Sequence, residues 1–591
     1  MTVKVFHRIL ICVVLILSVF VNPKPVFAFD IYNFFVDSTD DTHDADLDDF
    51  VCADASGHCT LRAALEQSKT LTWNGDKVNI FFNLYSPATI VLHDHLPQYT
   101  DASVINNHTE KQITINGNSY MGLLINGNED TTIKGLIFED FGGYAIDITF
   151  NGTDVITNNV FIDNDPGIYV IGGQWYGDVH ITGNYIGYNP YTESRDGNTN
   201  GIYVSDVSNT LENHNLFIGG DSAEDGNIIA GNGLSGIFIN NEKIDTQIVI
   251  RNNYIGMADD TTPAYNYKHG IEVENSLGRL NIGGDYLAHK NLIAGNKNVG
   301  IYIERSSNTF IQGNTFSANA AGTAYIPNQY GDIRIFDSPY LRIGGDSPAY
   351  GNVIPQGVSV ESNSINNTSS MIKHNLIGIS RSGFVFPKEA DRDGIWVEQA
   401  TGFPEISFNT ITNFRNGIII LRDSSMVPIL NNHIYNNSGL GIDLNNDGVT
   451  PNDAPPDADT GPNGLQNFPV ISNVEIIFSI GDLKQVMFDV SIASKPNTTY
   501  YIQVLSSPFC NPSGYGEGKQ IFYSNPVTTD SNGYGVFEEL TDFYPLNIIG
   551  PCLTATATEW DGVHYLGTSE FSEGVMAWQP ETLFLPLIVR P

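Results

Sequence analysis

A phrase of four residues, Gly-Ile-x-Val or Gly-Ile-x-Ile, returns along the chain between residues 122 and 445. Two apolar positions in it flank a variable one, which is the alternation expected of a β-strand with one buried face. Turns rich in Gly and Asn separate the copies, and no unit contains a stretch with helical periodicity. The clearest copies begin at Gly167, Gly201, Gly236, Gly270, Gly300 and Gly394.

The copies mark the units of a solenoid. Asn-x-Ile and Ile-Gly-Gly phrases lie between them, so each unit holds three short strands and three turns. A unit this short cannot bury its apolar face alone and must stack on its neighbours. The sequence therefore predicts an all-β fold, with a parallel β-helix of about twelve or more coils over residues 76–442. The first strands of twelve coils should start at residues 122, 145, 167, 201, 236, 270, 300, 332, 357, 394, 417 and 441.

Asparagine recurs in the turns between these strands. Stacked Asn side chains hydrogen-bond from one coil to the next. We therefore predict turn ladders rather than ligands for Asn159, Asn184, Asn232, Asn253, Asn296, Asn314 and Asn375.

The variable position of the phrase points outward, because its two neighbours point into the core. Aromatic rings and carboxylates gather there and at the next outward position. Rings stack on sugars and carboxylates accept sugar hydroxyls, so the face predicts a glycan groove. The alternative is an aromatic ladder that stiffens the sheet by cross-strand contact. The predicted ligand-binding residues are Tyr169, Tyr203, Phe238, Glu272, Tyr302, Trp396 and Glu398.

The same face suggests a catalytic alternative. Glu274 and Glu304 should occupy adjacent coils, with Arg305 beside them. Retaining glycosidases hold two carboxyl groups about 5 Å apart, and close like charges raise one of the two pKa values. Adjacent carboxylates also arise by chance in an acidic chain, so both interpretations stay open.

An acidic loop, residues 443–467, follows the last coil. Asp443, Asn445, Asp447 and Asp453 supply oxygen atoms at short spacing, and Gly448 allows a turn. Hard oxygen ligands in this pattern suit a structural Ca²⁺ ion. The twelfth position of an EF-hand would be Ala454, which excludes a true EF-hand. A solvated acidic linker is the equal alternative, and no organic cofactor is expected.

The two ends of the chain differ from the solenoid. Residues 1–28 have the charged start, apolar run and small-residue site of a secretory signal. Residues 29–75 are expected to cap the first coil, residues 468–578 to form an antiparallel β-sandwich, and residues 579–591 to be a tail too short to span a membrane. Sequence proximity favours the disulfides Cys52–Cys59 and Cys510–Cys552.

The net charge of the chain restricts the classes of partner that the protein can bind. The chain has a net charge of −38, and removal of the predicted signal with its three positive residues makes it −41. Nucleic acid, which needs basic patches, is thereby excluded as a partner. The charge also disfavours anionic membranes, and anionic polysaccharides unless a cation bridges them. Solubility of a long β-protein is the simpler reason for the acidity.

The phrases resemble the right-handed parallel β-helix repeats of secreted bacterial proteins and polysaccharide lyases. The stretch from Asp54 to Leu65, with Cys59-Thr-Leu-Arg-Ala-Ala-Leu65, resembles the CSLREA region found ahead of bacterial β-helices, with Thr60 in place of Ser. Residues 496–558 resemble the C-terminal β-sandwich that follows such helices. The resemblance implies a fold and a place outside the cell, and it implies no single activity.

These observations together predict a secreted, non-catalytic protein of the cell surface or extracellular space. It would engage an extracellular polysaccharide or another surface component. The alternative is a polysaccharide lyase or glycoside hydrolase that acts on an extracellular polysaccharide through the same face.

Overall fold

The computed structural model describes most of the chain. The predicted signal at residues 1–28 and the tail at residues 579–591 lie outside the described residues. The described residues are 30–71, 76–97, 103–107, 112–126, 130–149, 152–172, 177–205, 214–240, 246–361, 370–388, 391–400, 405–480, 483–542, 544–545 and 550–577.

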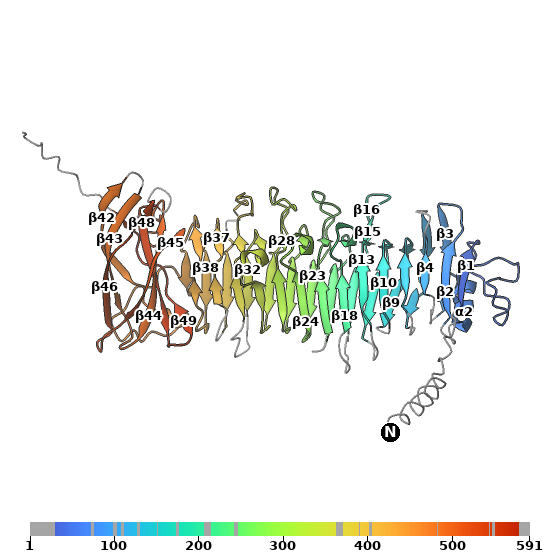
Figure 1. Cartoon of the computed structure of the whole chain (residues 1–591), viewed down its shortest axis with the longest axis horizontal. Coiled ribbons are helices and arrows are strands. Elements are labelled where there is room, and N and C mark those ends of the chain that lie inside the picture. Colours follow the sequence, from blue (N-terminus) through green and yellow to red (C-terminus); the bar gives the residue numbers. More distant parts are fainter. Residues whose placement is uncertain are drawn as a thin grey trace, which may run out of the picture.

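Three long parallel sheets wind into a β-helix, which confirms the predicted fold class (Figure 1). The phrase Gly-Ile-x-Val builds the 12-stranded sheet, and all twelve predicted first strands are present in it. These strands are β6 (Leu123–Ile125), β9 (Ile146–Thr149), β12 (Ile168–Ile171), β17 (Ile202–Ser205), β20 (Ile237–Asn240), β23 (Ile271–Glu274), β26 (Ile301–Glu304), β29 (Ile333–Phe336), β32 (Val358–Glu361), β35 (Ile395–Glu398), β38 (Ile418–Leu421) and β41 (Ile442–Leu444).

The 14-stranded sheet begins earlier than the predicted start of the solenoid, because β1 of the cap pairs in parallel with β2. Its strands are β1 (Ile31–Val36), β2 (Lys77–Phe82), β4 (Val104–Asn106), β7 (Thr132–Lys134), β10 (Asp154–Thr157), β13 (Val179–Thr182), β18 (His214–Ile218), β21 (Thr246–Ile250), β24 (Arg279–Gly283), β27 (Thr309–Gln312), β30 (Arg342–Gly344), β33 (Met371–Lys373), β36 (Glu405–Ser407) and β39 (Ile429–Leu430).

The 13-stranded sheet completes each coil with very short strands. They are β3 (Ala88–Val91), β5 (Ile113–Asn116), β8 (Ile137–Glu139), β11 (Val160–Ile162), β14 (Tyr185–Ile186), β19 (Ile228–Ile229), β22 (Tyr254–Ile255), β25 (Leu292–Ile293), β28 (Thr315–Phe316), β31 (Val353–Ile354), β34 (Leu376–Ile377), β37 (Thr410–Thr412) and β40 (His433–Tyr435). A small antiparallel pair, β15 (Tyr188–Asn189) and β16 (Ser194–Arg195), projects from one coil.

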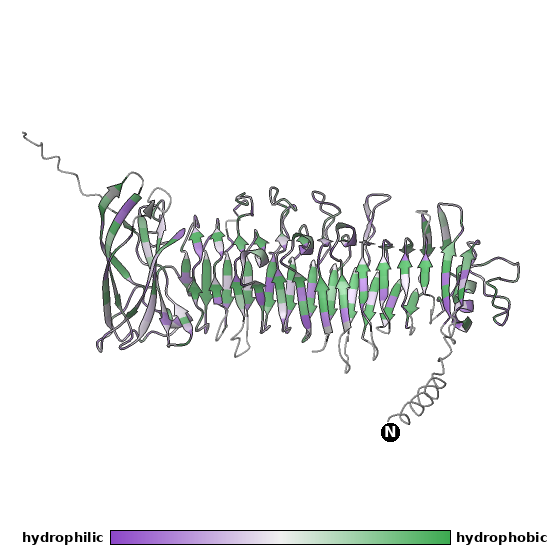
Figure 2. Ribbon diagram, in the orientation of Figure 1, coloured by the Kyte–Doolittle hydropathy of each residue, from purple (hydrophilic) through white to green (hydrophobic). Residues whose placement is uncertain are grey.

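Inward side chains of the three sheets form one continuous core. Ile146, Ile168, Ile202, Ile237 and Ile271 form a column in which every side chain is fully buried. Figure 2 shows the corresponding hydrophobic colour along most strands of the solenoid. Burial of such a column is the main favourable term in the folding of the helix.

Glycine opens the phrase because the coils approach each other closely there. A Cβ atom on Gly236 would lie 2.8 Å from the carbonyl oxygen of Gly270, and one on Gly270 would lie 2.7 Å from that of Gly300. Real Cβ atoms do not come so near, so only Gly fits at these two positions. Ala145 and Asp332 open the two coils that have no Gly there. Steric exclusion at the corner explains why the Gly of the phrase recurs.

Two ladders of buried Asn side chains connect the coils at two corners. In most rungs the Oδ1 atom accepts hydrogen bonds from the backbone N–H and the side chain of the preceding Asn, as Asn184 does from Asn159 at 2.9 and 3.2 Å. Asn232 and Asn296 accept from the side chain of the preceding Asn. The first ladder contains Asn159, Asn184, Asn227, Asn253, Asn291, Asn314, Asn352, Asn375, Asn409 and Asn432. The second contains Asn164, Asn198, Asn232, Asn266, Asn296 and Asn328. The predicted turn ladders are thus confirmed.

The N-terminal end is covered by helix α2 (Leu61–Leu71), which packs against β1 and β2. Thr60 accepts a hydrogen bond from the backbone N–H of Ala63 at 3.0 Å and so caps the helix. Arg62 is buried and binds Asp41 at 2.7 Å, which fixes the loop below the helix. The disulfide Cys52–Cys59 is present as predicted.

The C-terminal domain is the predicted β-sandwich, and its disulfide Cys510–Cys552 is present. Its sheets are antiparallel and enclose a separate core. One contains β42 (Val470–Ile480), β43 (Leu483–Ala493), β46 (Tyr534–Leu540) and β47 (Tyr544–Pro545). The other contains β45 (Gln520–Thr528), β44 (Thr499–Ser507), β48 (Cys552–Trp560), β49 (Tyr565–Thr568) and β50 (Val575–Met576).

The sandwich closes the open end of the last coil (Figure 1). Side-chain oxygens of the sandwich accept hydrogen bonds from backbone N–H groups of the last coil. Without the sandwich, these N–H groups would need a further coil as their partner. Glu517 accepts from Asn437 N at 2.9 Å, Glu570 from Leu444 N at 2.8 Å, and Thr568 from Ile429 N at 2.8 Å. The sandwich therefore satisfies the backbone edge that a solenoid must protect.

No helix in the described part of the chain is long and apolar enough to cross a membrane. The short 3₁₀ helices η2 (Ala223–Asp225), η3 (Leu287–His289), η4 (Pro348–Tyr350) and η5 (Pro462–Leu465) lie in loops between strands.

The Asn ladder predicts a large effect of a single substitution. Asn291→Ala removes the oxygen that accepts from the backbone and side chain of Asn253, and the amide that donates to Ile250 O and Asn314, so four buried hydrogen bonds are lost. We expect a loss of about 2–4 kcal/mol in the free energy of unfolding, measured in urea. The control Asn281→Ala lies on the outer face of β24 and should cost under about 0.5 kcal/mol. Equal losses for both variants would contradict a structural ladder.

A second prediction concerns pH. Burial raises the pKa of Glu570 to about 7, whereas an unfolded glutamate titrates near 4.5. The folded chain thus binds more protons than the unfolded chain between these values, so this group lowers stability as pH rises from about 4.5 to about 7. Glu570→Gln keeps an oxygen acceptor for Leu444 N and removes the charge.

We expect the wild type to lose up to about 3 kcal/mol more stability between pH 5 and pH 8 than Glu570→Gln. Urea unfolding of both proteins at the two pH values measures the difference. Parallel losses in the two proteins would show that Glu570 does not titrate in this window.

Candidate functional site

The outward column of the 12-stranded sheet lies in the register that the sequence predicts. Tyr169 pairs with Tyr203, Tyr203 with Phe238, Phe238 with Glu272, and Glu272 with Tyr302. Arg334, Ser359, Trp396 and Ile419 continue the same column. The candidate residues therefore share one face, and their contacts divide that face into three parts.

The first part is an aromatic stack. The rings of Tyr169 and Tyr203 lie with centroids 5.2 Å apart, and those of Tyr203 and Phe238 lie 5.0 Å apart and nearly parallel. The faces of these rings are therefore turned toward each other. A sugar ring needs an open aromatic face, so this part fits the stiffening ladder better than a glycan groove.

The second part surrounds Glu272, whose side chain is buried although its position points outward. Ser235 Oγ donates to its Oε2 at 2.6 Å, and Lys268 forms an ion pair with its Oε1. The ring of His269 stacks on Tyr302 at 4.8 Å, and burial lowers the pKa of His269 to about 4. Glu272 has its partners within the protein, so we leave it out of the binding site.

Glu274 and Glu304, the catalytic candidates, are direct register partners on β23 and β26. Burial, and then the charge of Glu272, raises the pKa of Glu274. Glu304 accepts a hydrogen bond from Tyr302 Oη at 3.0 Å and binds Arg305. Neither glutamate lines either of the two pockets described below, and catalysis at this pair stays a prediction.

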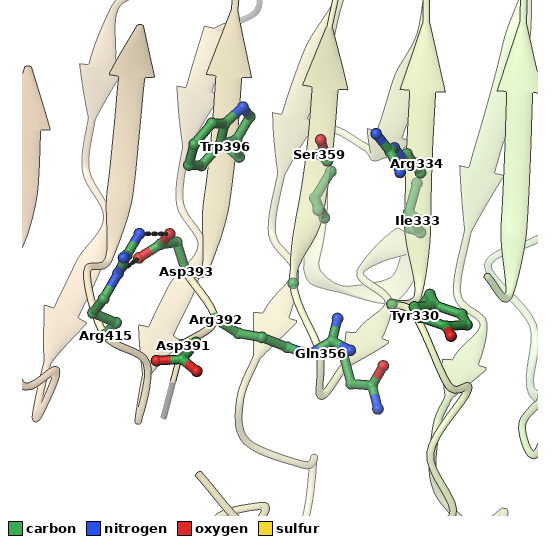
Figure 3. A pocket seen from close by; sticks show the side chains of 13 residues that line it. Tyr330, Ile333, Arg334, Gln356, Ser359, Asp391, Arg392, Asp393, Trp396 and Arg415 are labelled. Carbon is green, nitrogen blue, oxygen red and sulfur yellow. Dashed lines mark hydrogen bonds and ion pairs between the residues drawn. The ribbon is translucent and has the colours of Figure 1, made fainter. Parts of the chain in front are cut away.

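The third part is a pocket of about 240 Å³ around Trp396 (Figure 3). Arg334, Ser359 and Trp396 come from the successive strands β29, β32 and β35. The strands are about 4.8 Å apart, so the two large side chains are separated by about 10 Å with the small Ser359 between them. A short side chain between two long ones hollows the face at this point.

Turn residues form the other wall of the pocket. Tyr330, Gln356, Arg392 and Arg415 precede the four strands from β29 to β38. Arg415 binds both carboxylate oxygens of Asp393, at 3.0 and 2.6 Å. This bidentate pair holds the rim in place.

Polar contacts also order the rest of the pocket. Trp396 Nε1 donates to Glu398 Oε2 at 3.2 Å, and Glu398 in turn binds Arg422 at 2.6 Å. Arg334 Nη2 donates to Glu361 Oε1 at 3.3 Å, and Arg392 Nη2 donates to the carbonyl of Gln329 at 3.2 Å. Glu398, a predicted ligand residue, thus orients the indole ring.

The pocket lies where the second Asn ladder stops. Asn328 donates to Asp332 Oδ1 at 3.1 Å, and Gln356 N donates to Asp332 Oδ2 at 2.8 Å. An Asn side chain both accepts and donates hydrogen bonds, whereas a carboxylate only accepts them. The side chain of Asp332 therefore cannot donate a hydrogen bond to a further rung. Burial raises the pKa of Asp332 to about 6. The next turn is therefore joined to Asp332 through the backbone N–H of Gln356 and not through a further Asn side chain.

The turn residues that line the pocket were not predicted, although their positions in the sequence indicate them. Tyr330, Arg392 and Arg415 each stand two residues before a predicted coil start, at 332, 394 and 417. The residues two before each coil start form a second outward column, next to the column of the variable position in Gly-Ile-x-Val. Lys268, Thr199 and Asp165 occupy it in earlier coils.

A second pocket, of about 540 Å³, lies along the same corner at earlier coils. Asp140, Asp163 and Asp165 line it together with Asn198 and Leu234. Glu139 lies near these acids, and its pKa is raised by burial and by the charges of Asp140 and Asp163. The corner thus carries an acidic hollow at one end and the arginine-lined hollow at the other.

The predicted calcium ligands have hydrogen-bond partners within the protein. Asn416 Nδ2 donates to the buried Asp443 at 3.3 Å, Asn445 donates to Asp447 at 2.9 Å, and Asn467 donates to Asp453 at 3.1 Å. No group of three or more His, Cys, Asp or Glu side chains arranged for a metal occurs within the described ranges. The calcium loop stays a prediction.

Comparisons with known proteins identify no family. No family model matches the chain, and no curated protein matches it. Among solved structures, the enzymatically active domain of tailspike protein 2 from bacteriophage CBA120 has 11% identity and a TM-score of 0.21, over 86% of this chain and 73% of that one. The full-length tailspike protein 2, from an Escherichia coli O157:H7 bacteriophage, has 10% identity and a TM-score of 0.23, over 86% and 66%.

The tailspike protein gp49 of Acinetobacter baumannii bacteriophage Fri1, a capsular polysaccharide depolymerase, has 10% identity and a TM-score of 0.27. The alignment covers 93% of this chain and 86% of that one. These similarities are too low to transfer an activity to this chain.

The contacts of Glu272 predict a coupling between two residues. Lys268→Ala should cost about 1 kcal/mol in the free energy of unfolding, because it leaves a buried carboxylate without its cation. The cost is moderate because the lysine is partly exposed to water. In a Glu272→Gln background, the same substitution should cost almost nothing. A double-mutant cycle in urea measures the coupling, and additive losses would contradict a structural role for the pair.

Proposed function

We propose that the protein is an extracellular carbohydrate-binding β-helix that holds one sugar residue of a polysaccharide in the Trp396 pocket. The observation that carries this proposal is the environment of Trp396. Its register partners are Ser359 and Ile419, so among the described residues its ring faces no other aromatic ring of the column. The indole is half-buried and lines a pocket.

The pocket combines the two features by which proteins bind sugars. An aromatic ring offers an apolar surface to the C–H face of a pyranose. Ser359, Gln356 and the arginines supply polar groups beside it, which fix the orientation of a ligand. A volume of about 240 Å³ is below the roughly 300–1,000 Å³ of pockets for drug-sized ligands, so the pocket suits one unit of a longer chain.

A place outside the cell agrees with this function. Both disulfides join cysteines in the arrangement expected of an exported chain. The apolar start of the chain and its positive residues support export through a signal sequence. We therefore propose a secreted or surface-located protein whose partner is an extracellular polysaccharide.

Binding without cleavage is the main form of the proposal. In the pocket, both oxygens of Asp393 accept hydrogen bonds from Arg415, and Asn416 N adds a further one at 3.1 Å. A carboxylate engaged in this way is poorly placed to exchange a proton with a substrate. Cleavage by a lyase or glycosidase is the second candidate function, and the adjacent Glu274 and Glu304 favour it.

Two variants test the pocket directly. Trp396→Ala removes the stacking surface, and Ser359→Phe fills the hollow between Arg334 and Trp396. Each should weaken glycan binding at least tenfold, measured by titration calorimetry with the polysaccharide that binds the wild type best in an array. The control is Phe310→Ala, an outward aromatic on β27 of another sheet. Wild-type affinity in both pocket variants would contradict the proposed site.

The same incubations distinguish binding from cleavage. Wild type and Glu304→Gln are kept with each bound polysaccharide, and new reducing ends and unsaturated sugars are assayed. We expect neither product from either protein. Products that form with the wild type and are absent with Glu304→Gln would contradict a binding protein without activity. They would indicate catalysis at the Glu274–Glu304 pair.

A further inference from the structure

Exposed tyrosines lie at the corner that leads into the 12-stranded sheet, on the N-terminal side of Trp396. Tyr267 and Tyr330 stand in the turns before β23 and β29, and they are 58% and 63% exposed. Trp396 lies on β35, two coils beyond β29, just as β29 lies two coils beyond β23. The three rings therefore follow one another at about 10 Å along the solenoid axis. We call these three residues the aromatic row.

Backbone hydrogen bonds join the turns of this corner from coil to coil. Lys297 N donates to Asn266 O at 3.0 Å, and Tyr330 N donates to Asn298 O at 3.2 Å. The guanidinium of Arg392 extends from the turn before β35 to the turn that holds Tyr330 (Figure 3). The aromatic row thus stands on one continuous surface.

The ring of Tyr267 is held in place and still has an open face. It meets the ring of Tyr265 edge to face, with the centroids 5.0 Å apart. Tyr265 is in turn held by two cations, because the guanidinium carbon of Arg195 lies 3.9 Å and Nζ of Lys297 lies 4.0 Å from its ring centroid. An edge-to-face contact covers at most one face of Tyr267. A fixed ring with an open face can stack on a sugar at a low entropic cost.

Loops border the aromatic row on one side. They follow β14, β22, β28 and β34, which are alternate strands of the 13-stranded sheet, and they project from the same side of the solenoid (Figure 1). The loops are residues 188–195, 257–263, 318–325 and 379–385. Neighbouring loops touch, since Arg195 lies over Tyr265 and Ala320 N donates to Asp260 Oδ1 at 2.5 Å. A ligand at this corner is thereby directed along the solenoid axis.

We infer that the glycan lies along this corner, parallel to the solenoid axis, and stacks on Tyr267 and Tyr330 as well as on Trp396. The inference rests on the proposed function and adds the class of its ligand, an internal segment of an extended polysaccharide. The row from Tyr267 to Trp396 spans four coils, or about 19 Å. A pyranose unit of an extended glycan is about as long as one coil, so a segment of about five units reaches all three rings. Several such contacts supply the affinity that a pocket for one sugar lacks.

Oligosaccharides of different length test the inference. The probes are linear fragments of two, four and six units from cellulose, xylan, mannan, β-1,3-glucan and polygalacturonate. Titration calorimetry compares the wild type with Tyr267→Ala, Tyr267→Trp, Tyr330→Ala and Trp396→Ala. The matched control is Tyr286→Ala. Tyr286 is 67% exposed and meets the ring of His289 edge to face, but it lies in a loop after β24 of the 14-stranded sheet.

We expect the six-unit probe of at least one glycan to bind the wild type at least tenfold more tightly than its two-unit probe. Tyr267→Ala should remove most of this gain and change the affinity for the two-unit probe by less than about twofold. Tyr330→Ala should already weaken the four-unit probe, and Trp396→Ala should weaken probes of every length. Tyr267→Trp keeps a ring in place and should behave as the wild type, as should Tyr286→Ala. Thermal unfolding verifies that each variant is folded.

Failure of the inference and failure of the proposed function give different results. Equal affinity for the two-unit and six-unit probes, lost in Trp396→Ala, would contradict the extended contact and leave the pocket as the site. A gain with length that persists in both Tyr267→Ala and Tyr330→Ala would also contradict the inference, because the glycan would then follow another path. No binding of any probe to the folded wild type would contradict both proposals.

Discussion

The parallel register between coils is the constraint on which the rest of this molecule depends. Each strand hydrogen-bonds to the equivalent strand of the next coil, so a residue stacks on its counterpart about 4.8 Å away. Ile stacks on Ile in the core, Gly passes closely over Gly at one corner, and Asn bonds to Asn at two others. Polar rungs of this kind are costly when incomplete, because an unpaired buried amide loses its hydration without compensation. The ladders thus hold the coils in a single register.

The same constraint explains how much of the fold could be predicted. All strands of the 12-stranded sheet could be predicted, because their inward residues repeat in every coil. A Gly opens all of these coils except those that begin at Ala145 and Asp332. The strands of two residues in the 13-stranded sheet, such as β14, carry too little pattern to be assigned in this way. The strand β1 was placed in the cap, because it is separated by helix α2 from the strand with which it pairs. Sequence order hides such a pairing.

The candidate site was predicted less well, for a physical reason. The sequence shows which residues point outward, but it does not show whether their side chains face each other or the solvent. Tyr169, Tyr203 and Phe238 looked like sugar-binding rings, and they stack on one another. Glu272 looked exposed, and it is buried by Ser235 and Lys268.

The Trp396 pocket coincides with an interruption of the regular pattern. The second Asn ladder runs from Asn164 to Asn328 and ends on Asp332, which accepts hydrogen bonds but cannot extend them. Among the described residues, the ladder contact at this corner returns at Asn437, which donates to Glu517 of the sandwich. Tyr330, Arg392 and Arg415 stand at a turn position that also varies in the earlier coils, where the ladder is intact. Functional sites are expected where local rules are relaxed while the surrounding structure supplies the stability. In this solenoid the core and the first ladder continue unbroken behind the pocket, so the relaxed corner still rests on a rigid scaffold.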